Sequence, residues 1–86
     1  MVNDEKLRIL MVEHAAEDTE RIMQLLAQGG FQSDYLRVTT AVALQNALLN
    51  QHWDIVLSDY DLPQLNAQSV LQAIKNQGLD IPLIIV

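Results

Sequence analysis

Two short apolar segments of this chain end in residues that could hold a metal ion or attack phosphorus. The segment Ile-Val-Leu-Ser ends in Asp59, and Asp61 follows two positions later. The segment Leu-Arg-Ile-Leu-Met-Val ends in Glu13 and His14. A carboxylate can act as a nucleophile or bind a divalent cation. If both segments are parallel strands of one sheet, their ends meet at the edge where open α/β sheets bind ligands.

The apolar pattern places these residues in alternating strands and helices. A run of apolar residues predicts a buried strand, whereas apolar residues three or four apart predict a helix. Strands are predicted at 7–12, 35–38, 54–58 and 81–86, and helices at 17–28, 41–50 and 67–76. Thr40 is a suitable N-cap for the second helix. The strand–helix alternation with near-continuous apolar strands is typical of a doubly wound parallel α/β sheet.

The helical spacing also predicts which side chains face the sheet. The expected inward residues are Ile22, Leu25, Leu26 and Met23 in the first helix, Leu44, Ala47 and Leu48 in the second, and Val70, Leu71 and Ile74 in the third. Trp53, just before the third strand, is expected to pack at the edge opposite the acids. The acids are therefore predicted to sit on a frame with apolar residues on both faces.

Composition limits the classes of function. The 86 residues suit one small domain, and the net charge of −6 argues against nucleic-acid binding by this segment. The longest apolar run, residues 81–86, is far too short to span a bilayer, so we expect no membrane partner. The absence of cysteine and of a secretory signal pattern at the start fits a cytoplasmic protein.

The predicted fourth strand reaches Val86 without a helix after it. An uncovered apolar edge strand invites association. We therefore expect residues 1–86 to be the N-terminal portion of a single domain in a longer protein, with a domain completed by a partner as the alternative. The bare strand also predicts self-association of this segment, for example as a homodimer.

Several motifs, in order, resemble the receiver domain of bacterial two-component response regulators. They are the first strand with Glu13-His14, Asp18 early in the first helix, Gly29-Gly30-Phe31, Asp54 through Asp59 to Pro63, and the entry into the fourth strand from Asp80. The resemblance covers residues 7–86. It implies a flavodoxin-like fold with strand order 2-1-3-4, and a fifth strand and last helices that are absent from the chain.

The resemblance also implies a function and site residues. Asp59 would accept a phosphoryl group from a histidine kinase or phosphotransfer protein and so switch an attached or separate output domain. Glu13 and Asp59 would act on Mg²⁺, with the backbone carbonyl of Asp61 as a further metal ligand. Such a protein is not an enzyme beyond catalysing its own phosphorylation and dephosphorylation.

Three departures from the family pattern bear on this function. His14 replaces the second acid of the pair, and imidazole is a poor Mg²⁺ ligand, so Mg²⁺ binding should be weakened or lost. The simpler interpretation of His14 is a partly exposed histidine at a strand end, with a metal ligand as the alternative. Ala67 stands where the family usually has glycine. The family's switch Ser/Thr after the fourth strand, and the Lys after the fifth strand that pairs with the phosphoryl group, would lie beyond Val86.

Two other functions fit parts of the pattern. A degenerate receiver would have lost the Mg²⁺ chemistry and would act as a phosphorylation-independent interaction module. Asp59-Tyr60-Asp61 also matches the Asp-x-Asp motif of haloacid-dehalogenase-type phosphatases. In those enzymes the motif follows the first strand, whereas here it follows the third, and a lone short motif is weak support.

Overall fold

The computed structural model describes residues 6–59 and 65–85 of the chain. Its elements, in chain order, are β1 (Leu7–Val12), α1 (Ala16–Gln28), β2 (Ser33–Val38), α2 (Ala41–Asn50), β3 (Ile55–Ser58), α3 (Ala67–Asn76) and β4 (Leu83–Ile85). The predicted order of strands and helices is confirmed. Within the described ranges, no helix has both the length and the hydropathy needed to cross a bilayer.

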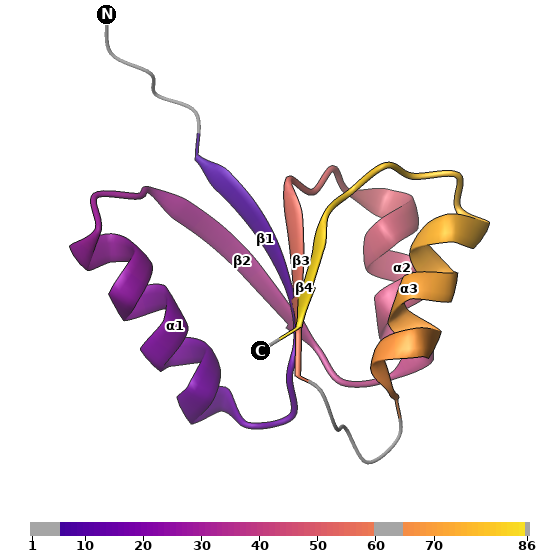
Figure 1. The fold of residues 1–86 in the computed structure, drawn as a ribbon, viewed down its shortest axis with the longest axis horizontal. Helices are drawn as coiled ribbons and strands as arrows, with labels where there is room; N and C mark the ends of the chain where they lie inside the picture. The colour runs from indigo at the N-terminus through magenta and orange to yellow at the C-terminus, as the bar shows by residue number, and fades with distance from the viewer. Residues whose placement is uncertain (1–5, 60–64, 86) are drawn as a thin grey trace, which may run out of the picture.

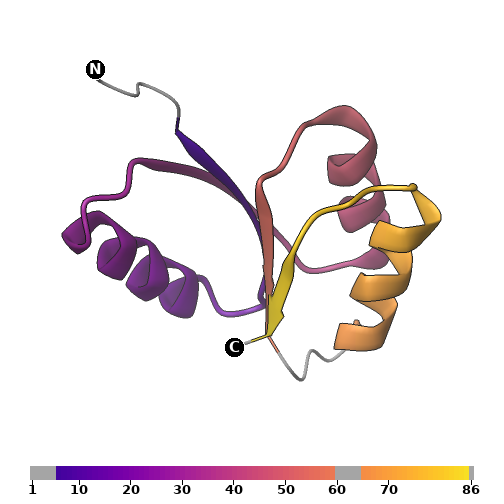
Figure 2. The same ribbon diagram turned by 45° about the horizontal axis from the view of Figure 1, so that its top comes forward.

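The four strands form one parallel sheet in the order β2-β1-β3-β4. Helix α1 covers one face of this sheet, and α2 and α3 cover the other (Figures 1 and 2). Val12 at the end of β1 is level with Val38 of β2 and with Ser58 of β3. The carboxyl ends of the three strands therefore meet at the same edge, which confirms the predicted doubly wound arrangement.

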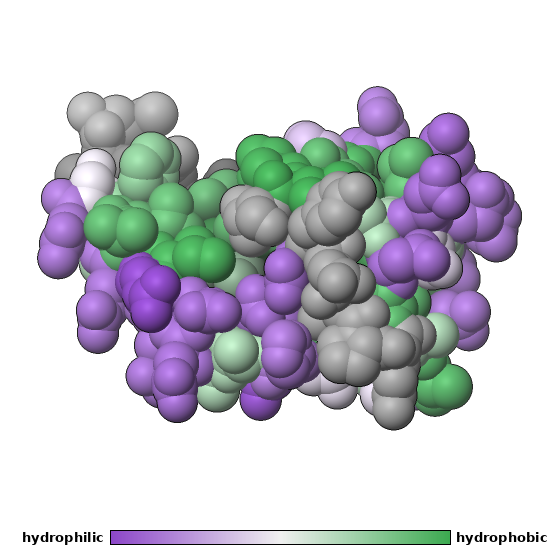
Figure 3. Space-filling view, turned by 60° about the horizontal axis from the view of Figure 1, so that its bottom comes forward, coloured by the Kyte–Doolittle hydropathy of each residue, from purple (hydrophilic) through white to green (hydrophobic). Residues whose placement is uncertain are grey.

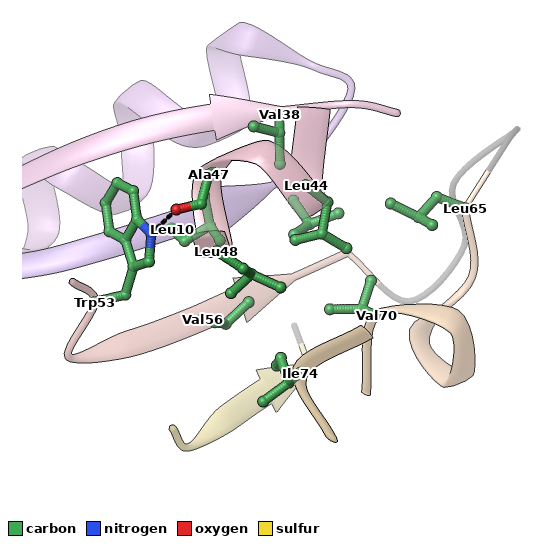
Figure 4. Close-up of a cluster of buried hydrophobic side chains, with 11 residues drawn as sticks. Leu10, Val38, Leu44, Ala47, Leu48, Trp53, Val56, Leu65, Val70 and Ile74 are labelled. Carbon is green, nitrogen blue, oxygen red and sulfur yellow. Dashed lines mark hydrogen bonds between the residues drawn. The ribbon is translucent and has the colours of Figure 1, made fainter. Parts of the chain in front are cut away.

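The larger core lies between the sheet and the pair α2–α3 (Figure 4). Its buried members are Leu10, Val12, Val38, Leu44, Ala47, Leu48, Trp53, Val56, Leu65, Val70 and Ile74. The indole Nε1–H of Trp53 donates a 2.9 Å hydrogen bond to the carbonyl of Ala47. Trp53 therefore packs as predicted, and its polar atom has a partner inside the core.

The core under α1 is smaller. Ile9, Met11 and Leu57 form its buried centre, with partly buried side chains of α1 packed against them. Helix α1 does not cover this face of the sheet beyond Leu57. Ile84 of β4, which pairs in register with Leu57, is 46% exposed. The α1 face of the sheet is thus well covered over β1 and poorly covered over β4.

Two predicted inward side chains are exposed. Leu25 of α1 is 61% exposed and Leu71 of α3 is 41% exposed. Successive helical residues are about 100° apart. Leu25 therefore lies about 80° from the centre of the stripe formed by Ile22 and Leu26, and Leu71 lies about 80° from the centre of the stripe formed by Val70 and Ile74. The buried stripe of each helix is narrower than its run of apolar residues, so apolar spacing overestimated the inward faces.

The ends of some elements differ from the prediction. Strand β2 begins at Ser33, two residues before the predicted start. Strand β4 begins at Leu83, two residues after the predicted start, since Pro82 has no N–H to donate to the sheet; Val86, the predicted end, lies outside the described residues. The predicted cap of α2 is confirmed, because the hydroxyl of Thr40 accepts a 3.1 Å hydrogen bond from the backbone N–H of Ala43. None of these differences moves the acidic strand ends.

Candidate functional site

Glu13 and Asp59 lie at the carboxyl edge of the sheet, each directly after its strand. The N–H of Glu13 donates to the carbonyl of Val38 at 3.3 Å, and the N–H of Asp59 donates to the carbonyl of Val12 at 2.9 Å. Each acid is therefore fixed by a backbone bond to the neighbouring strand. The sheet itself brings both positions to the same level.

The carboxylate of Glu13 is almost fully buried, with only 5% of its side chain exposed. Its Oε1 accepts a 3.1 Å hydrogen bond from the N–H of Ala15, the residue that precedes α1. The alanine side chain cannot cap this helix, so the carboxylate of Glu13 satisfies one of the free N–H groups at its start. A negative charge near a helix N-terminus is also stabilised by the helix dipole. Glu13 is thus held in one orientation.

His14 lies between the two acids. Its Nδ1 is 3.5 Å from Oε1 of Glu13 and 3.9 Å from Oδ2 of Asp59, and one ligand atom of each residue lies within 4.8 Å of the others. The side chain of His14 is 55% exposed and that of Asp59 is 26% exposed. The structure therefore brings together three of the predicted site residues, including the histidine. Asp61, the fourth, lies outside the described residues.

A hollow of about 260 Å³ adjoins these residues and is lined by Glu13, Asp18, Arg21, Ile22 and Asp59. Arg21 lies 3.7 Å from Asp18 through its guanidinium, one turn apart on α1. In the view that brings this edge of the sheet forward, hydrophilic side chains gather below a band of hydrophobic surface (Figure 3). The hollow therefore has acidic walls with one guanidinium on its rim.

Arg37 was not among the residues singled out from the sequence, yet it supports the site directly. Its Nη1 donates to the backbone carbonyl of Glu13 at 3.1 Å and to that of His14 at 3.2 Å. Arg37 therefore fixes the turn that carries two of the three clustered side chains. The one sequence signal was an arginine near the end of the predicted strand 35–38, and in the sheet this arginine pairs with Met11, one residue before the end of β1.

The fold family implies Mg²⁺ at this edge, and the donor set is a poor match for it. Mg²⁺ takes oxygen donors in near-octahedral geometry. Here the donor atom between the two carboxylates is an imidazole nitrogen, which suits Zn²⁺, Cu²⁺ or Ni²⁺ better than Mg²⁺. Among the described residues, the group of Glu13, His14 and Asp59 does not fit Mg²⁺.

Comparison with known proteins identifies the fold. No protein-family model and no curated protein sequence matches the chain. Among solved structures, the chain is similar to the MaeR response regulator bound to beryllium trifluoride, with a TM-score of 0.80 and 19% sequence identity. The match covers 93% of this chain and 66% of the other, so the chain spans only part of that protein. At this identity the likeness concerns the fold, and the chain has the flavodoxin-like receiver fold with strand order 2-1-3-4.

Proposed function

We propose that the protein is a signal receiver whose Asp59 accepts a phosphoryl group from the phosphohistidine of a kinase or phosphotransfer protein. The observation that carries this proposal is the position of Asp59. It follows β3 at the carboxyl edge, is partly exposed, and borders the hollow of about 260 Å³. The similar solved structure is a response regulator, which agrees with this role.

In this reaction an oxygen of the Asp59 carboxylate forms a bond to phosphorus while the phosphorus–nitrogen bond of the donor breaks. The donor imidazole leaves and takes a proton from solvent. Glu13 is fixed by its bond from the Ala15 N–H and so forms a rigid wall of the site. Arg37 donates to the backbone carbonyl of Glu13 and so holds the turn that carries this wall of the hollow.

The charge at the site argues for slow phosphorylation. A phosphoryl group is anionic, and Glu13, Asp18 and Asp59 already surround the hollow. In the family, Mg²⁺ neutralises these carboxylates. Since the donor set here does not fit Mg²⁺, we expect that ion to bind more weakly and to offset less of the negative charge. Among the described residues that line the hollow, Arg21 is the one that carries a positive charge, and its guanidinium offsets part of this repulsion.

One observation favours a second function. His14 stands between the two acids, where the family has a third carboxylate. If this replacement abolishes phosphorylation, the fold serves as a phosphorylation-independent interaction module. The phosphatase alternative has less support, because Asp59 follows β3 and that motif normally follows the first strand.

The test is phosphorylation of the full-length protein by a small phosphodonor such as phosphoramidate. We expect intact-mass spectrometry to detect the gain of one phosphoryl group, slowly formed and removed by hydroxylamine, which cleaves acyl phosphates. The Asp59→Ala variant is expected to show no gain, and an Asp54→Ala variant, at the opposite edge, is the matched control.

A phosphoryl group that survives hydroxylamine, or that persists in Asp59→Ala, would contradict the proposed acceptor. Complete absence of labelling, with or without divalent cations, would favour the interaction module. Turnover of a phosphate monoester would instead support a phosphatase.

A further inference from the structure

We propose that Glu13, His14 and Asp59 form a binding site for a divalent transition-metal ion of the Zn²⁺ type. The chemistry of the three donors is two carboxylate oxygens and one imidazole nitrogen. Imidazole together with carboxylates suits Zn²⁺, Co²⁺ and Ni²⁺, whereas Mg²⁺ selects oxygen alone. This inference rests on donor geometry and does not require Asp59 to accept a phosphoryl group.

Two of the three donor separations are close to those of a tetrahedral ion, and the third, between the oxygens of Glu13 and Asp59, is within 4.8 Å. Zn²⁺ binds nitrogen and carboxylate oxygen at roughly 2.1 Å, so two donors of a tetrahedral site are roughly 3.4 Å apart. The Nδ1 of His14 is 3.5 Å from Oε1 of Glu13 and 3.9 Å from Oδ2 of Asp59. The first separation already fits a tetrahedral edge. The second needs only a small rotation of the exposed imidazole.

The burial of Glu13 gives an independent reason for a cation here. An ionised carboxylate that is almost fully buried is costly unless it is paired or binds a metal. Within residues 6–59 and 65–85, its side chain has a hydrogen bond from Ala15 and the contact with His14. The bond from Ala15 orients Oε1 without using all its lone pairs, as groups behind metal ligands do.

The charge of the donor set agrees with a divalent ion. Two carboxylates and a neutral imidazole carry a charge of −2, which one divalent ion neutralises. Zinc sites with three protein ligands keep a fourth position open, and the hollow of about 260 Å³ adjoins the three residues. Arg37 fixes the carbonyls of Glu13 and His14, so the turn holds both donors before metal binds.

The experiment is metal titration of the full-length protein, freed of any affinity tag and treated with chelator. Zn²⁺ and Mg²⁺ binding is measured by calorimetry, and Co²⁺ binding by its visible absorption, which is strong in tetrahedral sites. The chain has two histidines, so His14→Ala is compared with His52→Ala. His52 is exposed and precedes β3, at the opposite edge of the sheet, and serves as the matched control.

We expect Zn²⁺ to bind at least about ten-fold more tightly than Mg²⁺, and His14→Ala to weaken Zn²⁺ at least about ten-fold while His52→Ala leaves it unchanged. The Co²⁺ absorption should disappear in His14→Ala. His14 is more than half exposed, so the variant should keep the fold, which circular dichroism verifies. Equal Zn²⁺ affinity in His14→Ala and the unmodified protein, or equal affinity for Zn²⁺ and Mg²⁺, would overturn the proposal.

Discussion

Replacing His14 with aspartate is expected to destabilise the metal-free protein and to make it respond to Mg²⁺. The Nδ1 of histidine and the Oδ1 of aspartate are each one bond from Cγ. In the same rotamer, the new carboxylate would therefore lie near 3.5 Å from Glu13 Oε1 and 3.9 Å from Asp59 Oδ2. The substitution places three carboxylates where the described structure has two and an imidazole.

The size of the effect follows from these two distances. Two like charges at such a separation repel by about 1 kcal/mol in the dielectric of water. The side chain of residue 14 is 55% exposed, so the value for water is used here; for the pair with Glu13, whose side chain is only 5% exposed, it is a lower bound. Two such pairs sum to about 2 kcal/mol, and rotation of the new side chain into solvent relieves part of the repulsion. We expect His14→Asp to lower the free energy of unfolding by about 1 to 2 kcal/mol relative to His14→Asn, which has the same shape without the charge.

The assay is urea denaturation of both variants, followed by circular dichroism in chelator and again in Mg²⁺. If Mg²⁺ binds the native His14→Asp protein with a dissociation constant near 1 mM, about 10 mM of the ion restores about 1.4 kcal/mol. The unmodified protein and His14→Asn should gain much less. If His14→Asp and His14→Asn are equally stable without metal and neither responds to Mg²⁺, then residue 14 does not face the two acids and the geometric argument is refuted.

The other predictions concern the frame that holds the site. Arg37→Met should lower the free energy of unfolding, measured by chemical denaturation, by about 1 kcal/mol, because it removes an exposed donor shared by two carbonyls of the turn after β1. An unchanged stability would show that the turn does not depend on Arg37. Trp53→Phe should lower the free energy of unfolding by only about 1 kcal/mol in the same assay. The Ala47 carbonyl loses the indole donor but still accepts a hydrogen bond from the Gln51 N–H at 3.2 Å, and a loss several-fold larger would contradict this reasoning. Val70→Ala should cost about 2 kcal/mol, whereas Leu71→Ala on the same helix should cost under about 1 kcal/mol, and equal costs would contradict the assigned inward face of α3.

The topology could be predicted from the sequence because its signals are local. Apolar runs such as 7–12 and 55–58 are bounded by polar residues, and Thr40 caps the helix that follows it. Parallel pairing then follows from the alternation of strands and helices, since each crossover needs a helix. Once the sheet is parallel, the acids that end β1 and β3 have to share an edge. The meeting of Glu13 and Asp59 was therefore a consequence of strand order alone.

Side-chain contacts between distant segments could not be predicted in this way. Arg37 is 24 residues from Glu13 in the sequence, and nothing in the local pattern indicates that its guanidinium reaches back to the turn after β1. The exposure of Leu25 has a similar cause, because the width of the buried stripe depends on how a helix lies on the sheet. Such features depend on the angle and distance between packed elements, which periodicity does not determine.

The different surroundings of Glu13 and His14 explain how this site could change its chemistry without losing its fold. Glu13 is buried, begins α1 through the Ala15 N–H and lies against the sheet, so replacing it would disturb the helix as well as the site. His14, one residue later, is more than half exposed and is held through its backbone carbonyl by Arg37. A substitution at position 14 therefore alters one donor atom and one charge while the backbone stays fixed. The donor set can therefore change at this position without moving the backbone, and for that reason metal selectivity, measured on His14 variants, is the most direct test of what the site does.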